Sequence, residues 1–287
     1  GGHRTALVPV EARVSDLVDT ELAVAMTPGP LRRVVSADRV ADIGLRLAVL
    51  GGVFVVWLLT TRAADSIFFP VPTDVLPAVW NDWLTDATTW QDNIVPSVIR
   101  LLYGFVLAAV VSIALGLAIG RSPAFRELVE PTIHFLRAIP PPALLPVFLI
   151  IFGIGDMQKV MVIAFGVAPP ILLNSIDGAR SVDQLHLDSA AAFQIGRRGR
   201  ITKVIFPAAA PNVFAGLRVS MSLAVILMVI SELVAATDGI GFRIMRDSRN
   251  FAYVDMWAGL VVLAILGILL NAGLTLIERR VLRWRLL

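Results

Sequence analysis

The stretch AGLVVLAILGILLNAGLTLI, residues 258–277, decides the class of fold. Asn271 is its only strongly polar residue, and the stretch contains no charge and no proline. A helix of about 20 apolar residues spans the hydrocarbon core of a bilayer with its backbone hydrogen bonds satisfied internally. This stretch therefore predicts a transmembrane helix.

The composition extends this interpretation to the whole chain. Of the 287 residues, 57% are hydrophobic and only 16% are charged, whereas about a quarter of the residues of a soluble domain are charged. The composition therefore argues against both a water-soluble fold and disorder. The chain has no cysteine, which excludes disulfide frameworks, thiolate nucleophiles, zinc–thiolate sites and iron–sulfur clusters.

Six apolar runs are long enough to predict membrane-spanning helices, and they lie at 43–61, 97–119, 128–153, 158–176, 208–235 and 256–277. The predicted fold class is all-α, a polytopic membrane protein with about six transmembrane helices. Prolines from Pro131 to Pro146 interrupt the third run, and Pro169-Pro170 interrupt the fourth. Broken helices at membrane depth are tolerated where they pack on protein or line a cavity, so these breaks indicate a pathway through the membrane.

The distribution of basic residues predicts the orientation. With the first residues inside, 17 of the 25 Lys and Arg residues lie on the cytoplasmic side, as the positive-inside rule requires. We therefore expect a cytoplasmic extension at 1–40, a transmembrane domain at 41–287 and cytoplasmic termini. The net charge of +3 then reflects topology and not nucleic-acid binding. One outer loop departs from the rule, because it carries Arg243, Arg246 and Arg249. The interpretation that this loop is a surface for an acidic or anionic partner stays open.

The loop between the fourth and fifth spans, residues 177–206, carries the clearest functional pattern. Residues 183–195 have helical periodicity and include the small residues Ser189 to Ala192, and the basic run that starts at Arg197 ends the helix. A short helix of small residues is a surface that another protein can approach closely. On this evidence alone, an ordinary connecting loop is the alternative.

The loop resembles the coupling motif of bacterial ABC importer permeases, the binding-protein-dependent transport inner-membrane component family. The consensus of that motif is Glu-Ala-Ala, three residues, Gly, nine residues, then Ile-x-Leu-Pro. With the final Pro at Pro207, Asp188-Ser189-Ala190 and Gln194 stand at the Glu-Ala-Ala and Gly positions without a gap. A second register places Gly196 on the Gly and Ala190 on the Glu, but it leaves the distance to Pro207 two residues short.

Other stretches are similar to the nitrate, sulfonate and taurine branch of this family. Together they follow the order and spacing of that branch from about residue 65 to residue 287. The similar stretches are Phe69–Leu76, Ser97–Phe105, Gly116–Gly120, Arg137–Gly155, Asn174–Gly178, Gly216–Arg218, Glu232 and Glu278–Arg285.

The resemblance implies the type I ABC importer permease fold and a multi-pass subunit of a bacterial inner membrane. Such a subunit forms, by alternating access, the pathway for a small anionic solute of the sulfonate, taurine or nitrate kind. The implied partners are a second copy of this chain, two cytoplasmic ATP-binding subunits, an extracytoplasmic substrate-binding protein and membrane lipid. ATP and Mg would be bound by the partner subunit, and no cofactor or metal is expected in this chain.

The resemblance also assigns the residues that would couple to the ATP-binding subunit. Asp188 is expected to meet a basic partner, and Ala190 to Ala192 are expected to allow close packing. The full set is Asp188, Ser189, Ala190, Ala191, Gln194, Gly196, Arg197 and Pro207. The chain contains no Gly-x-x-x-x-Gly-Lys-Ser/Thr string, the phosphate-binding loop of ATPases, so we expect it to be no enzyme.

Ionisable residues at membrane depth are expensive and are therefore functional candidates. Two interpretations remain open for them, because they either pair with one another to hold helices or line the solute route. Arg137 and Arg218 favour an anion by charge, or else neutralise Glu130 or Glu232. The candidates for the translocation pathway are Arg137, Pro140, Pro141, Asn174, Arg218 and Glu232.

Two features of the apolar runs bear on helix packing and bending. The three prolines at 140–142 cannot continue a regular helix, which predicts either a gate or a static bend. Gly116 and Gly120 have the small-x-x-x-small spacing that is typical of helix packing.

Two rival functions belong to other classes. A secondary transporter or channel without ATPase partners predicts internal inverted repeats, and the sequence shows no convincing repeat. An intramembrane enzyme needs a nucleophile and base or a metal site in the spans, and the three histidines, His3, His134 and His186, are too scattered to build one.

Overall fold

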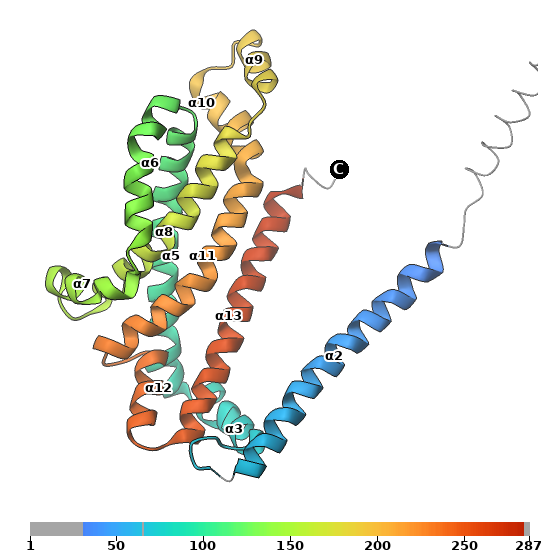
Figure 1. The fold of residues 1–287 in the computed structure, drawn as a ribbon, viewed down its shortest axis with the longest axis vertical. Coiled ribbons are helices and arrows are strands. Elements are labelled where there is room, and N and C mark those ends of the chain that lie inside the picture. Colours follow the sequence, from blue (N-terminus) through green and yellow to red (C-terminus); the bar gives the residue numbers. More distant parts are fainter. Residues whose placement is uncertain (1–30, 65, 284–287) are drawn as a thin grey trace, which may run out of the picture. The chain divides into compact units, whose positions relative to one another are not determined.

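The structure is a computed structural model that describes residues 31–64 and 66–283 (Figure 1). Every regular element in this part of the chain is helical. The helices are α2 (Leu31–Ala64), α3 (Pro72–Ala78), α4 (Ala87–Thr89), α5 (Val95–Gly120), α6 (Pro123–Ala138), α7 (Leu145–Phe152), α8 (Asp156–Arg180), α9 (Gln184–Ala192), α10 (Arg197–Arg200), α11 (Phe206–Ala235), α12 (Ile240–Arg249) and α13 (Tyr253–Val281). Some of these helices are joined by short π-helical turns, at Val79–Leu84, Trp90–Ile94 and Ile201–Ile205, or by a 3₁₀ turn, at Pro141–Leu144.

The chain divides into two units, residues 1–63 and residues 64–287. In the first unit the structure describes a single helix, α2, which already begins at Leu31 within the expected cytoplasmic extension. Residues 1–30 of that extension lie outside the described residues. All the contacts discussed below belong to the second unit.

The described helices match the six predicted spans in order. Four stretches are long and apolar enough to cross a membrane, and they are Ala87–Gly120, Asp156–Arg180, Arg197–Val234 and Tyr253–Val281. Helices α6 and α7 meet the same criterion only as a bent pair, and α2 contains a shorter apolar part, Ala48–Ala64. The predicted all-α membrane fold is therefore confirmed.

The third predicted span, 128–153, is not one helix. Helices α6 and α7 are bent by 84° relative to each other, and the backbone is extended at Ile139 and Pro140. Proline lacks the N–H that a helix needs, and it disfavours helical geometry in the residue before it. The break therefore falls at the three consecutive prolines, whereas the single Pro131 stays inside α6.

The expected interruption of the fourth span is wrong. Helix α8 continues without a break through Pro169 and Pro170. Pro169 and Pro170 lack the N–H groups that would bond to the carbonyls of Phe165 and Gly166. Helix α11 packs against this region, where its Ser220 hydroxyl donates a hydrogen bond to the carbonyl of the adjacent Val167 at 3.0 Å. Prolines are tolerated inside membrane helices that pack on neighbouring helices in this way.

Helices α5, α8 and α11 form the core, to which Leu274 of α13 adds (Figure 1). Glycines bring α5 and α8 into close contact. A Cβ atom on Gly116 would lie 2.4 Å from the Cβ of Ser175, and one on Gly120 would lie 2.6 Å from the carbonyl oxygen of Ile176. Only a residue without a side chain fits at these points, so the predicted packing role of Gly116 and Gly120 is confirmed.

Two of the three arginines in the basic cluster after α11 make contacts within their own subunit, whereas Arg249 is exposed, so an outer surface for an acidic or anionic partner stays a prediction. Arg243 of α12 is buried, its guanidinium lies 4.3 Å from the ring centre of Trp83, and it donates to the carbonyl of Asp82 at 3.1 Å. Arg246 pairs with the buried Asp247. These arginines hold α12 to the segment that precedes α5 and to its own carboxylate.

Candidate functional site

The loop between α8 and α11 folds into two short helices. The periodicity of residues 183–195 predicted the first, α9, whereas the second, α10, lies in the basic run that was expected only to end that helix. Asp183 caps α9, since its carboxylate accepts a hydrogen bond from the backbone N–H of Leu185 at 3.0 Å. Helix α9 ends at Ala192, α10 follows at Arg197, and a π-helical turn leads into α11. Helices α8 and α11 therefore hold α9 from both ends.

Gln194 supplies evidence on the register of the coupling motif. Its φ angle is +53°, and the N–H groups of Gln194 and Ile195 bond back to the carbonyls of Ala191 and Ala190. This left-handed residue after a helix is usually glycine, because a Cβ atom is strained there. Gly196, in contrast, has a φ of −60° and needs no glycine. The geometry favours the gapless register, which places Gln194 at the consensus Gly.

Replacing Gln194 with glycine is expected to stabilise the protein by about 1 kcal/mol, because the left-handed conformation costs about that much for a residue with a Cβ atom. The measurement is the thermal unfolding midpoint in detergent. Gly196→Ala is the matched control and should change the midpoint little, because a Cβ at Gly196 meets no atom within 4 Å. A lower midpoint for Gln194→Gly would contradict the strain argument.

The side chains of α9 divide into an inward and an outward face. Leu187 packs with Ala179, Val182 and Ile205 of its own chain, and Ala190 is only 3% exposed. The expectation that Ala190 offers close approach to a partner is therefore corrected, since its methyl group already lies against the rest of this subunit. The outward face consists of Asp188, Ser189, Ala191 and Ala192, all of which are exposed.

Two large apolar side chains at the ends of α9 were missed as site residues. Leu185 is 69% exposed and Phe193 is 80% exposed. Both lie at the polar end of the structure, where bilayer contact does not explain them, and apolar surface of this kind marks a protein interface. Leu185 lies within the helical periodicity predicted for residues 183–195, but no sequence signal distinguished an inward from an outward face of that helix.

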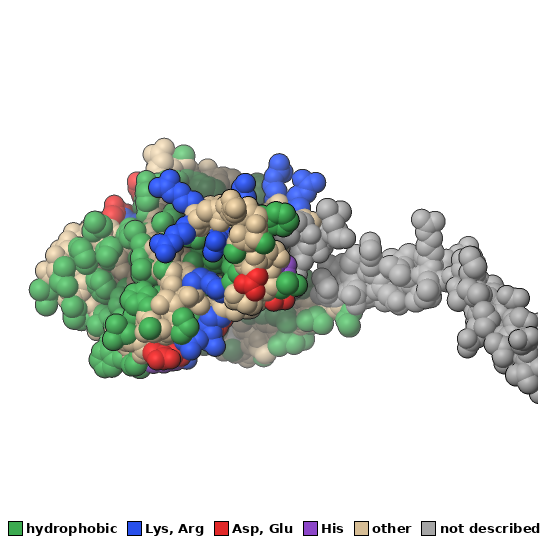
Figure 2. Space-filling model, turned by 90° about the horizontal axis from the view of Figure 1, so that it is seen from above, with side chains coloured by type: hydrophobic (Ala, Val, Ile, Leu, Met, Phe, Trp, Pro, Cys, Tyr) green, Lys and Arg blue, Asp and Glu red, His purple; other side chains and the backbone are tan. Residues whose placement is uncertain are grey.

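Basic side chains surround α9. Figure 2 looks onto this end of the molecule and shows Lys and Arg side chains gathered over it. In the sequence, Lys and Arg residues stand on both sides of α9, from Arg180 to Lys203. Asp188, predicted to meet a basic partner, accepts a hydrogen bond from Gln184 at 2.9 Å and makes no ion pair with any described residue.

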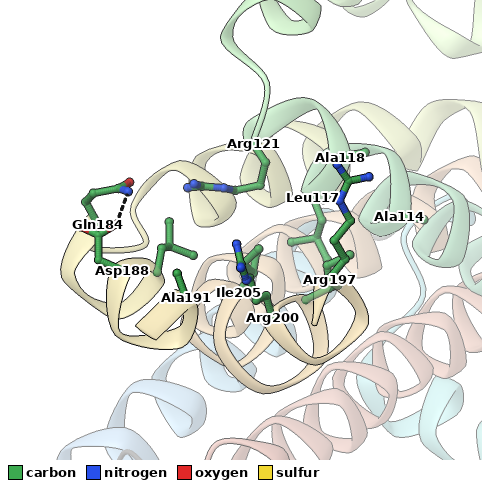
Figure 3. A pocket seen from close by; sticks show the side chains of 12 residues that line it. Ala114, Leu117, Ala118, Arg121, Gln184, Asp188, Ala191, Arg197, Arg200 and Ile205 are labelled. Atoms are coloured by element: carbon green, nitrogen blue, oxygen red, sulfur yellow. Dashed lines mark hydrogen bonds between the residues drawn. The ribbon is translucent and has the colours of Figure 1, made fainter. Parts of the chain in front are cut away.

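A cavity of about 860 Å³ opens beside α9, between it and the end of α5 (Figure 3). Its walls come from the last two turns of α5, from α9, and from α10 with the turn after it. Of the predicted coupling residues, it brings Asp188, Ala191 and Arg197 together. Ser189, Ala190 and Pro207 line a smaller hollow of about 380 Å³ with Phe193.

Glu232, a candidate for the solute pathway, instead lies in a buried ionic centre at the opposite end of the helices. Its carboxylate accepts hydrogen bonds from the hydroxyl of Ser97 at 2.7 Å, from Arg100 at 3.1 Å and from the backbone N–H of Gly241 at 2.9 Å. Arg100 also pairs with Asp156 of α8 and Asp238 after α11. This placement favours helix pairing over solute contact for Glu232.

The remaining pathway candidates do not converge. Arg218 pairs with Glu278 of α13, and Glu130 lies 3.7 Å from Arg126 and 3.8 Å from His134, so neither arginine neutralises Glu130 or Glu232 as considered above. Arg137 is exposed at the end of α6 and pairs with no described carboxylate.

The two prolines and the asparagine lie near helix contacts. Pro140 begins the bend, and Pro141 packs beside Gly166 of α8. Asn174 donates to the carbonyl of Pro170 at 2.8 Å. Among the described residues, no group of three or more His, Asp or Glu side chains could hold a metal ion.

Comparison with known proteins identifies a family and relatives that this chain is similar to. A profile of the family described as "binding-protein-dependent transport system inner membrane component" matches residues 108–283. The taurine transport system permease protein TauC of Escherichia coli (strain K12) is 31% identical over 249 residues, which are 85% of this chain and 90% of TauC. The putative aliphatic sulfonates transport permease protein SsuC of Bacillus subtilis (strain 168) is 33% identical over 66% of this chain and 68% of SsuC.

A solved structure shares the fold. A chain of the MetNI methionine ABC transporter in an inward-facing conformation superposes with a TM-score of 0.58 at 20% identity, over 66% of this chain and 94% of that chain. At this identity the likeness concerns the fold alone.

Proposed function

Because this chain belongs to the binding-protein-dependent transport system inner membrane component family, it is the permease subunit of an ABC importer, and we propose that it carries a small sulfonate or similar anion inward by alternating access. ATP-binding subunits and a substrate-binding protein are its partners in this family. The chain itself is not an enzyme. It is a protein of the inner membrane.

The proposed solute class follows from two relatives and from the charges of the chain. The names of TauC and SsuC give taurine and aliphatic sulfonates as the solutes of those proteins. Both solutes carry a sulfonate group. Arg137 is exposed and free of any described carboxylate partner, so its charge is available to an anion that passes the bend at Pro140–Pro142.

The outward face of α9 is the single observation that carries the proposed coupling. Helix α9 is fixed by packing of Leu187 and Ala190 on its own subunit, and it presents Leu185 and Phe193 to the outside. An ATP-driven movement of a partner can reach the membrane helices only through an element that both proteins hold. We assign this role to α9, with Asp188, Ser189, Ala191, Gln194, Gly196, Arg197 and Pro207 at or near the contact.

The proposed assembly is a homodimer with two ATP-binding subunits, which would bind ATP and Mg. In the proposed orientation, α9 and both termini face the cytoplasm, and the Arg100 centre faces the substrate-binding protein. The basic side chains around α9 fit this orientation. Apolar side chains run exposed along α5 and α13, for example Val110 and Ile268, and lipid and the second copy would cover them.

Uptake by the reconstituted complex tests this function. With the ATP-binding subunit and the binding protein present, we expect uptake of a sulfonate to require ATP and to exceed uptake of its uncharged isostere at least about tenfold. Arg137→Gln should lower the uptake, whereas Arg280→Gln, which removes an exposed charge of the same kind at the end of α13, is the control for total charge. Uptake driven by an ion gradient without ATP would instead indicate a secondary transporter.

A further inference from the structure

The cavity beside α9 has the features of a ligand site in addition to the proposed coupling contact, with which it shares Asp188, Ala191 and Arg197. It is lined by Ala114, Leu117, Ala118, Arg121, Gln184, Leu187, Asp188, Ala191, Arg197, Arg200, Ile201 and Ile205. Its volume of about 860 Å³ is in the range of pockets that hold drug-sized organic ligands. A small inorganic anion would leave most of it empty.

Three arginines give the cavity a positive charge (Figure 3). Arg121 donates to the carbonyl of Ala179 at 3.3 Å, and Arg200 donates to that of Ile195 at 2.9 Å. Within the described part of the chain, none of the three forms an ion pair with a carboxylate. Asp188 also lines the cavity, so the net charge of the lining is +2. Arginine prefers phosphate and other oxyanions, because its planar fork donates two parallel hydrogen bonds to them.

Apart from Gln184, the rest of the lining is apolar, and part of it lies at the end of a membrane span. Ala114, Leu117 and Ala118 belong to the last two turns of α5, and the apolar span that contains them ends at Gly120. Arg121 follows directly. The cavity therefore changes from apolar to cationic at the depth where the acyl chains of a bilayer give way to the headgroups.

We propose that this cavity binds an anionic phospholipid, with the phosphate between Arg121, Arg197 and Arg200 and the upper part of an acyl chain against Leu117 and Ala118. Basic pockets at the ends of membrane helices bind anionic lipids in this manner. An acidic side chain of a partner protein would also satisfy the arginines, but it would leave the apolar wall at membrane depth uncovered. In the proposed orientation the lipid belongs to the cytoplasmic leaflet.

A lipid in this position would join two parts of the subunit. Arg121 directly follows the membrane helix α5, whereas Arg197 and Arg200 follow α9. A phosphate that accepts hydrogen bonds from both would hold α9 against α5. The site depends on the geometry of this chain alone, so its test does not require the transport complex.

Lipid binding to the purified full-length chain tests the proposal. We expect native mass spectrometry to show one tightly retained phosphatidylglycerol per chain, in preference to phosphatidylcholine. The double variant Arg121→Gln/Arg200→Gln should weaken phosphatidylglycerol binding about thirtyfold, because each arginine contributes about a factor of five at an anionic lipid surface. The matched control, Arg180→Gln/Arg198→Gln, removes the same charge from the same end but from outside the cavity lining, and it should bind as the original protein does.

A second variant covers the case in which the double variant fails to fold. Ala118 is exposed on the cavity wall, so Ala118→Trp should fill the apolar part and weaken lipid binding while all arginines remain. In a further measurement, inorganic phosphate is added to the lipid-bound protein as a competitor. Equal retention of both lipids, an equal loss in the Arg180/Arg198 control, or displacement of the lipid by millimolar inorganic phosphate would each overturn the proposal. The last result would assign the site to a free oxyanion.

Discussion

Replacing Arg100 with alanine is expected to lower the stability of the membrane domain by about 3–5 kcal/mol, the cost of removing one partner from a buried ion pair. The Arg100 side chain is 5% exposed and pairs with Asp156, Glu232 and Asp238. Without it, the fully buried carboxylate of Glu232 would keep only the hydrogen bonds from Ser97 and Gly241. The measurement is the thermal unfolding midpoint of the detergent-solubilised chain, together with the yield of monodisperse protein.

A matched arginine tests whether burial causes this loss. Arg180, at the end of α8, also pairs with a carboxylate, Asp177, but its side chain is 50% exposed. Exposed ion pairs contribute about 0–1 kcal/mol, so Arg180→Ala should shift the midpoint little. An equal shift in Arg100→Ala and Arg180→Ala would contradict the structural role of the Arg100 centre.

Replacing Phe193 with aspartate is expected to abolish co-purification with the ATP-binding subunit and ATP-driven transport. Phe193 is 80% exposed at the end of α9, so the change should leave the fold of the permease intact. A buried aromatic anchor in an interface contributes about 2–4 kcal/mol, and a carboxylate in its place would also have to lose its hydration. Leu185→Asp should act in the same direction with a smaller effect.

The control for this experiment lies at the other end of the molecule. Phe251 is 74% exposed in the turn between α12 and α13, so Phe251→Asp makes the same chemical change far from α9 in the fold. It should retain the ATP-binding subunit in a pull-down. Retention of that subunit by Phe193→Asp would remove α9 from the proposed contact.

The long apolar runs made the membrane fold predictable. An apolar stretch of about 20 residues has one stable arrangement in a bilayer, because only a helix satisfies its backbone groups there. The same reasoning located the loop that carries α9, and the motif spacing that ends at Pro207 identified Gln194 as the counterpart of the consensus glycine. Its positive φ agrees with that assignment.

Proline was a weaker guide, because its effect depends on what packs around it. Both Pro140–Pro142 and Pro169-Pro170 suggested interruptions in the sequence. The first run of prolines bends the chain by 84°, whereas α8 continues through the second, where Ser220 of α11 donates to a carbonyl of the same region. The sequence around a proline does not show which other helix packs against it in the fold.

Sequence alone determined that this chain is helical, spans a membrane and exposes a short helix between two spans, since these properties depend on local hydropathy and spacing. Tertiary structure alone decided that Ala190 faces inward while Phe193 faces outward, and that Glu232 pairs with Arg100. Both results depend on contacts between residues far apart in the chain, and the free energy of a buried charge or methyl group is set by whatever surrounds it in three dimensions.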